Sequence, residues 1–333
     1  MVVSGLLVLV LGLTPMICYA ALLWWLDRYE KEPLGLLSVA FLWGAIPSVV
    51  LALIMQVAFD APLTAIQDSH QLTYRLLGVS VVAPLTEEGV KVLALIALLL
   101  FLRREIDSPL DGLIYGGVIG FGFAAVENVF YLFAALTEGG VGGLVGLAFI
   151  RGGVFGLNHA MYTGFAGLGV ALSLETRSHP LKFLSVLTGF GLAVTTHAMH
   201  NALVTFGGQG VAFPLLIAVA VDWLGVAALL ASIVGALYLE RSRIAAYGQR
   251  LAAAEAISTE EVEVLTSPVQ RRLIRLELLL AGDLKRWRLM RRYHQRITEA
   301  AFTWHRISRD DPGAEPRLSQ LEGEFQQLRH TLA

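Results

Sequence analysis

Charge and cysteine are scarce in this chain of 333 residues. Only 16% of its residues are charged, whereas 56% are hydrophobic, and the mean hydropathy is +0.64. This composition is typical of an integral membrane protein. The single cysteine, Cys18, excludes an internal disulfide and any metal site built from several cysteines. A basic segment is missing ahead of the first apolar run, so we expect residues 1–26 to be a retained membrane span and not a cleaved signal peptide.

The few charged residues are distributed unevenly along the chain. Residues 1–240 hold 9 Lys and Arg against 15 Asp and Glu, a net charge of −6. Residues 241–333 hold 16 basic and 12 acidic residues, a net charge of +4, and read as helical and polar. We therefore predict a transmembrane domain over residues 1–240, followed by a mildly basic, helical cytoplasmic tail over residues 241–333.

Apolar runs long enough to cross a bilayer occur seven times, since about 20 apolar residues suffice for a helix to span it. The predicted spans cover residues 3–26, 34–58, 78–102, 112–135, 146–173, 183–206 and 214–239. The sequence thus predicts an all-α fold, a polytopic bundle of about seven transmembrane helices. Glycines recur in the fourth and fifth spans at spacings that allow close helix packing in lipid.

Basic residues gather in alternate loops between these spans. One set of loops contains Arg28, Arg103, Arg177 and Arg241, whereas the other set contains Asp60, Asp68 and Glu138. By the positive-inside rule the basic loops are cytoplasmic. We expect an extracytoplasmic N-terminus and a cytoplasmic C-terminal tail.

Four spans carry acidic, imidazole or amide side chains deep within apolar sequence. The segments read TEEGVK at 86–91, GFAAVEN at 122–128, GLNHAMYTG at 156–164 and THAMHN at 196–201. Such groups cost free energy in lipid and mark functional sites. At a rise of about 1.5 Å per residue, Glu87, Glu127, His159 and His197 each lie roughly 22–27 Å from a charged residue at the cytoplasmic end of their span. We interpret them as one reaction site between helices, in the outer part of the bilayer.

Glu87, Glu88 and Lys91 lie within one helical turn. The lysine can neutralise one carboxylate, so either the other is protonated or a further cation lies nearby. A self-satisfied structural ion pair is the alternative reading. Asp222 lies at a similar depth in the last span, where we expect it to pair with Arg151 or to form hydrogen bonds within the bundle.

Familiar protease motifs are mostly missing from the chain. It has no HExxH zinc helix, no GxGD pair, and no membrane serine with a convincing histidine partner. The LDG string at Leu110–Gly112 is a weak match to the LDG element of site-2 metalloproteases.

The ordered polar motifs nevertheless resemble one known family. EExxK at 87–91, FxxxEN at 123–128, a mid-span His159 and HxxxN at 197–201 resemble the PrsW family of intramembrane proteases. The strings at 27–33 and 111–116 also look like that family, and the resemblance covers roughly residues 15–240. The wider group of CAAX-prenyl and bacteriocin-processing membrane proteases pairs EExxxR, FxxxH and HxxxN. This chain departs from that pattern at Lys91 and at Glu127, and His159 is the candidate to replace the missing histidine.

The resemblance implies hydrolysis of a peptide bond in or near the membrane. The family is classed as metalloproteases, and some of its members are implicated in cleaving anti-sigma factors. The chemistry of the residues agrees, because a carboxylate can activate water, imidazoles can hold Zn²⁺ and an amide can stabilise an oxyanion. The candidate catalytic residues are Glu87, Glu88, His197 and Asn201; the candidate zinc ligands are Glu127, His159 and His197; the supporting residues are Lys91, Asn128 and His200.

We therefore expect an intramembrane endopeptidase that cleaves a single-span membrane protein near the outer part of the bilayer, with Zn²⁺ as cofactor and no nucleic-acid partner. The alternative is a non-enzymatic cation or proton carrier that uses the buried Glu and His cluster. Such carriers are commonly built from internal repeats, and the lack of repeats in this sequence favours the protease. The oligomeric state and the identity of the substrate stay open.

The predicted topology determines which loops an impermeant thiol reagent reaches in intact cells. Single cysteines placed within 60–70 or 137–142 are expected to be labelled, whereas cysteines at 106 or 178 are not, because only the first two loops lie outside. Labelling is measured by gel shift. The reverse pattern would overturn both the orientation and the depth assigned to the site.

Overall fold

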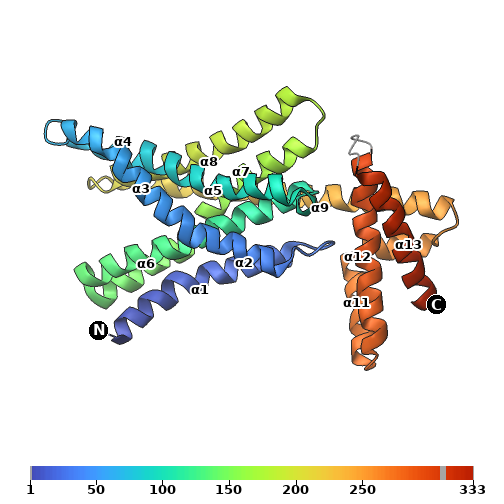
Figure 1. Cartoon of the computed structure of the whole chain (residues 1–333). Coiled ribbons are helices and arrows are strands. Elements are labelled where there is room, and N and C mark those ends of the chain that lie inside the picture. Colours follow the sequence, from blue (N-terminus) through green and yellow to red (C-terminus); the bar gives the residue numbers. More distant parts are fainter. Residues whose placement is uncertain (1, 308–312, 333) are drawn as a thin grey trace. The chain divides into compact units, whose positions relative to one another are not determined.

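The computed structural model describes residues 2–307 and 313–332, and Figure 1 shows the chain. Its helices are α1 (Val2–Leu26), α2 (Leu34–Trp43), α3 (Val49–Asp60), α4 (Gln71–Leu77), α5 (Ala83–Phe101), α6 (Pro109–Phe149), α7 (Asn158–Leu174), α8 (His179–Gly207), α9 (Ala212–Ala253), α10 (Thr259–Thr266), α11 (Pro268–Leu280), α12 (Leu284–Ile307) and α13 (Ala314–Leu332). Short 3-10 turns (Ala61–Ile66, Arg103–Glu105) and π-helical turns (Gly44–Ser48, Gly78–Val82, Ile150–Val154) join or interrupt them. No strand occurs among the described residues, so the predicted all-α fold is confirmed.

The chain divides into two compact units. The first comprises residues 1–26 and 32–233, and the second comprises 27–31 and 234–333. The short segment 27–31, predicted as a loop of the membrane domain, belongs to the second unit. There the Tyr29 hydroxyl donates to the Thr266 carbonyl at 2.8 Å, and the Tyr29 ring joins a hydrophobic core with Tyr247 and Phe325.

Five stretches are long and apolar enough to cross a membrane: Ser4–Leu26, Leu34–Ile66, Pro109–Leu174, His179–Gly207 and Ala212–Ala253. Two features account for the difference from the seven spans predicted. Helix α5 is not among the five and carries three charged residues, and the stretch from Pro109 to Leu174 counts once although it contains both α6 and α7. Length and composition thus support a multi-pass bundle but do not confirm the number seven.

The predicted loop at 136–145 is the largest local difference from the sequence-based expectation. Helix α6 continues through this glycine-rich stretch and is broken only at Gly140, where φ is 63° and ψ is −156°. Glycine adopts this positive φ without a steric penalty, so one residue suffices for the break. The expected span at 146–173 is itself interrupted at 155–157, between a π-helical turn and α7.

The start of α6 is defined by a capping box. The Ser108 hydroxyl accepts from the backbone amides of Leu110 and Asp111, and Asp111 accepts from the Ser108 amide at 2.7 Å. Both caps satisfy backbone donors that a helix start leaves unpaired. Asp111, which sits in the LDG string, therefore has a structural role in this fold.

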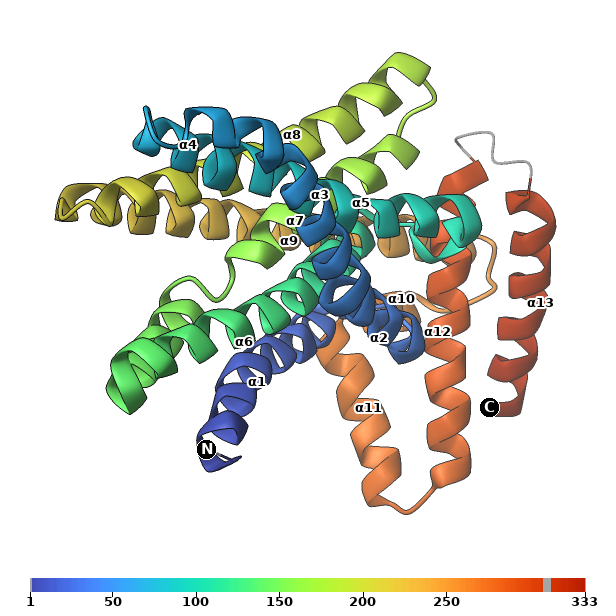
Figure 2. The ribbon, with the colours of Figure 1, turned by 60° about the vertical axis from the view of Figure 1, so that its left-hand side comes forward.

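Close contact between α6 and α7 brings the site residues of these two helices together. An added Cβ at Gly112 would lie 2.2 Å from the Gly167 carbonyl oxygen, and one at Gly120 would lie 2.2 Å from that of His159. Only glycine allows the two backbones this separation, as expected from the glycine spacing. Helix α1 runs beside α6 in both views (Figures 1 and 2).

We expect Gly112→Ala to lower the thermal stability of the detergent-solubilised protein, because the added methyl group must displace the α7 backbone. Overpacking of this kind costs about 1–3 kcal/mol. The control is Gly146→Ala, which lies in the same helix and has nothing within 4 Å of the added Cβ. Melting followed by size-exclusion chromatography compares the two variants, and equal melting temperatures would contradict the packing described.

Candidate functional site

The carboxylate of Glu88 lies at the centre of a buried polar network. Glu88 and Lys91 are both fully buried, and the Lys91 ammonium donates to Glu88 Oε1 at 2.7 Å. Thr163 on α7 donates to Glu88 Oε2 at 2.9 Å. The expected pair between Lys91 and Glu87 is longer, 3.8 Å. Lys91 therefore chiefly neutralises Glu88, and its contact with Glu87 Oε2 is the longer of its two ion pairs.

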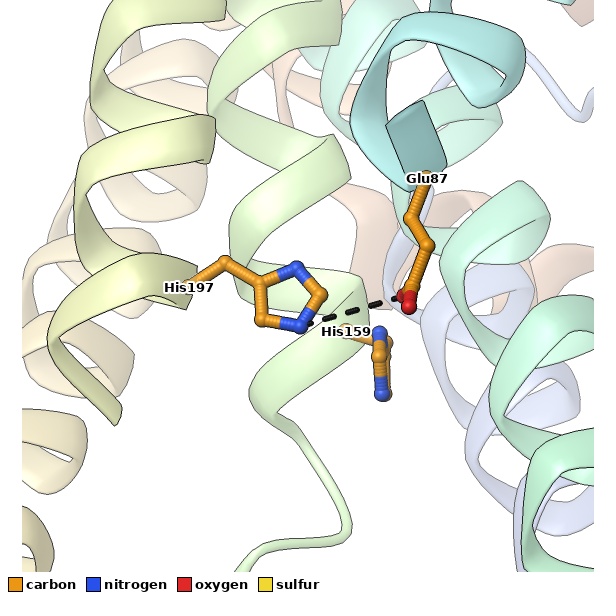
Figure 3. A group of neighbouring side chains, drawn as sticks. All are labelled: Glu87, His159 and His197. Carbon is orange, nitrogen blue, oxygen red and sulfur yellow. Dashed lines mark ion pairs between the residues drawn. The ribbon is translucent and has the colours of Figure 1, made fainter. Parts of the chain in front are cut away.

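His197 on α8 is held by the same carboxylate. Its Nδ1 lies 3.1 Å from Glu88 Oε1, and its ring stacks on Tyr162 with the centroids 4.6 Å apart. Because an ionised carboxylate only accepts, Nδ1 carries the proton and Nε2 carries a lone pair. This Nε2 lies 3.8 Å from Glu87 Oε2, as Figure 3 shows. Glu87 Oε2 is buried and has no hydrogen-bond partner among the described residues.

His159 on α7 is arranged in a parallel way, with a different carboxylate. Its Nε2 lies 2.9 Å from Glu127 Oε2, and its Nδ1 lies 3.1 Å from the Lys91 ammonium. An ammonium only donates, so Nδ1 is the acceptor and Nε2 donates to Glu127. Arg151, from the π-helical turn before α7, forms an ion pair with Glu127 and donates to Asn128 Oδ1 at 2.7 Å.

Three of these side chains form a group suited to a metal ion. Glu87, His159 and His197 each offer one ligand atom, and the three atoms lie within 4.8 Å of one another. Figure 3 shows the three side chains converging from α5, α7 and α8. The sequence had placed Glu127 in this group. In the structure Glu87 takes its place, because Arg151 neutralises Glu127 and His159 donates to it. The ligand role of all four residues stays a prediction.

The remaining predicted site residues lie on the wall of the same region. The Asn201 amide donates to the Val79 carbonyl at 2.8 Å. His200 Nδ1 lies 2.6 Å from Asp222 Oδ2, and Asn158 donates to the same oxygen at 3.0 Å. The predicted pairing of Asp222 with Arg151 is therefore wrong, because Arg151 is engaged by Glu127, and the alternative of hydrogen bonds within the bundle is confirmed.

A cavity of about 640 Å³ connects these groups. It is lined by Glu87, Glu127, His159, His197, His200 and Asn201, among others. This volume lies in the range of ligand-binding pockets. Its wall is thus polar around the three histidines, and the cavity is large enough to hold a substrate group.

Sequence reasoning missed three contributors to the site. Gln56 on α3 donates to Glu87 Oε1 at 3.1 Å, Thr163 donates to Glu88, and Tyr162 stacks on His197. The signal for Gln56 was available, because it is an amide late in an otherwise apolar span. Thr163 and Tyr162 carry no such signal, since either residue is common in a membrane helix.

Comparison with known proteins shows the family of this chain. The model of the PrsW family of intramembrane metalloproteases matches residues 32–233, more than half of the chain. The protein named Protease PrsW of Clostridioides difficile is 38% identical over 108 residues, which cover 32% of this chain and 43% of the relative. Protease PrsW of Geobacillus kaustophilus is 28% identical over 127 residues, covering 38% of this chain and 52% of the relative. The matches thus span about half the length of these curated relatives.

No solved structure matches the chain. The family match includes every residue of the network around Glu88. The chain therefore belongs to the PrsW family of intramembrane metalloproteases, and the family together with the apolar helices makes it a multi-pass membrane protein.

We expect Lys91→Met to destabilise the protein by about 3–5 kcal/mol, because it leaves the buried Glu88 carboxylate without its cation. The double variant Lys91→Met with Glu88→Gln should regain much of this loss, since both charges are removed. Unfolding is followed by SDS titration monitored by circular dichroism.

Lys182→Met is the matched control, because Lys182 lies at the start of α8 and is only half-buried. A Lys91→Met protein as stable as Lys182→Met, or a double variant no better than Lys91→Met alone, would show that the ion pair does not carry this stability.

Proposed function

We propose that this PrsW-family protein is an intramembrane endopeptidase that hydrolyses a peptide bond of a membrane-protein substrate at Glu87 and His197. One observation carries the proposal. The buried Oε2 of Glu87, which has no hydrogen-bond partner among the described residues, faces the lone pair of His197 Nε2 at 3.8 Å, on the wall of the cavity. A buried carboxylate oxygen that accepts no hydrogen bond is costly unless something binds to it.

A water molecule bridges this separation naturally. It can donate one hydrogen bond to Glu87 Oε2 and one to His197 Nε2, which leaves the lone pairs of its oxygen available for attack on a carbonyl carbon. Glu87 then accepts the proton as general base, a role that contributes about 10²–10⁴-fold to the rate. Glu88 keeps His197 in the tautomer that this geometry requires. The Asn201 amide, now bound to Val79, is our candidate to stabilise the oxyanion.

The same residues fit a zinc ion. Two imidazoles and one carboxylate form a ligand set typical of catalytic zinc. The second nitrogen of each imidazole is bonded to a carboxylate, Glu88 for His197 and Glu127 for His159, as in most zinc-binding histidines. Glu87 Oε2, His197 Nε2 and His159 Nδ1 would hold the ion, in place of the present bond between the Lys91 ammonium and His159 Nδ1. Bound there, Zn²⁺ would polarise the scissile carbonyl and favour loss of a proton from water.

Oε1 of Glu87 accepts from Gln56, and Oε2 is the carboxylate oxygen that faces both His197 Nε2 and the proposed ion. Proton acceptance and metal ligation therefore compete for Oε2, and a measurement of metal content distinguishes the two roles.

The substrate we propose is a single-span membrane protein. The site is built from α5, α7 and α8 of the unit that holds the apolar helices, so a substrate segment within the bilayer is the group best placed to enter. The family resemblance points to an anti-sigma factor as one candidate. The charged loops support an extracytoplasmic N-terminus and a site in the outer part of the bilayer.

We expect Glu87→Gln and His197→Ala each to lower the turnover of a single-span reporter substrate by about 10²-fold or more, because each removes one acceptor of the attacking water. Both variants should remain folded by size-exclusion chromatography. Glu138→Gln is the control, since this exposed carboxylate lies outside the cavity.

Cleavage is measured with purified protein in nanodiscs by mass spectrometry of the products, with zinc content determined on the same samples. Near-normal turnover of Glu87→Gln would remove Glu87 from the mechanism. Stoichiometric zinc that is lost in His159→Ala and His197→Ala would support ligation, whereas a metal-free active protein would support the glutamate base alone. Ion uptake into proteoliposomes without any cleavage would support the carrier instead.

A further inference from the structure

A second proton-handling pair lies on the wall of the cavity, outside the network around Glu88. His200 Nδ1 lies 2.6 Å from Asp222 Oδ2, and Asn158 donates to that same oxygen at 3.0 Å. These residues come from α8, α9 and α7, so three helices converge to build the pair. Neither the water between Glu87 and His197 nor the zinc ligand set uses it.

The Asp222 carboxylate is buried and has few hydrogen-bond donors around it. It is 1% exposed, and its Oδ1 has no hydrogen-bond partner among the described residues. Its Oδ2, by contrast, lies within hydrogen-bond distance of both His200 Nδ1 and the Asn158 amide, so the carboxylate fixes the orientation of the imidazole. The ring of Phe155 packs edge-on against His200 at a centroid distance of 4.8 Å and limits its rotation.

The Nε2 atom of His200 is available to contact a substrate. Nδ1 is engaged by Asp222, whereas Nε2 has no hydrogen-bond partner among the described residues, and the side chain is 16% exposed where it lines the cavity. His200 follows His197 by three residues, so the two imidazoles lie on neighbouring positions of one face of α8. The pair thus resembles a carboxylate-oriented imidazole that exchanges protons with a bound substrate.

We propose that His200 is the general acid of the hydrolysis, with Asp222 as the residue that positions it. This inference rests on the proposed function. Water oxygen bonds to the carbonyl carbon while Glu87 takes a proton from the water. The carbon–nitrogen bond then breaks, its electron pair stays on nitrogen, and the nitrogen takes the Nε2 proton of the His200 imidazolium. The proton held by Glu87 returns to His200 through water in the cavity, so the products are one carboxylic acid and one amine.

A general acid contributes far more to the cleavage of an amide than to the cleavage of an ester. An amine nitrogen must be protonated before it leaves, whereas an alkoxide oxygen can leave with less help from an acid. The test uses the full-length protein in nanodiscs and a synthetic single-span peptide containing the bond that the wild type cleaves. The second substrate is the same peptide with that one amide replaced by an ester. His200→Gln should lower kcat for the amide by about 10²-fold or more, with KM and the ester reaction little changed.

Asp222→Asn keeps the shape of the positioning residue and removes its charge, so it should show the same selective loss to a smaller extent. Met199→Leu, a neighbouring residue of α8 that is 42% exposed, should leave both substrates unaffected. Glu87→Gln should slow both substrates, since both need an activated water.

The outcomes separate this inference from the proposed function. An equal loss on amide and ester in His200→Gln would mean that His200 only supports the fold, and no loss on either would remove it from the reaction; both results overturn the inference while hydrolysis itself stands. A wild type that cleaves no single-span reporter, so that no such bond can be found, overturns the proposed function and the inference together.

Discussion

The burial of three charges on one turn of α5 is the constraint on which the site depends. A carboxylate or an ammonium removed from water costs several kcal/mol unless it is paired and its remaining hydrogen bonds are satisfied. Glu88 and Lys91 meet this condition together, and the bonds that complete it come from Thr163 on α7 and His197 on α8. Satisfying one buried ion pair thus holds three helices in a single register.

This arrangement makes two adjacent glutamates chemically different. Glu88 accepts from a lysine, a threonine and a histidine, so its charge is compensated by three donors, whereas its predicted catalytic role stays a prediction. Among the described residues Glu87 accepts a hydrogen bond only from Gln56, and its Oε2 accepts none beside the cavity. The difference between the two carboxylates follows from their neighbours, and such differences allow paired acids to have different roles.

Each of the three cavity histidines is oriented by a different acid. Glu88 holds His197, Glu127 holds His159 and Asp222 holds His200, at 3.1, 2.9 and 2.6 Å. Such a bond determines which ring nitrogen carries the proton and therefore which nitrogen the site can use. The close α6–α7 contact at Gly120 places His159 near Glu127, and Arg151 keeps Glu127 compensated, so backbone packing and charge pairing serve the same geometry.

Much of this protein follows from its sequence by itself. Composition and apolar runs determine an all-α membrane bundle, and polar residues inside those runs predict a site at Glu87, Glu88, Lys91, His159 and His197. These properties are local, because hydropathy and the rise of a helix place each residue at a depth without reference to its neighbours. Only the tertiary structure decided that Glu87, and not Glu127, offers the third ligand atom beside His159 and His197. It also decided that Asp222 pairs with His200. Depth along a helix is determined by the chain, whereas the rotation of each helix about its axis is determined by packing against the others, and that rotation selects which side chains meet.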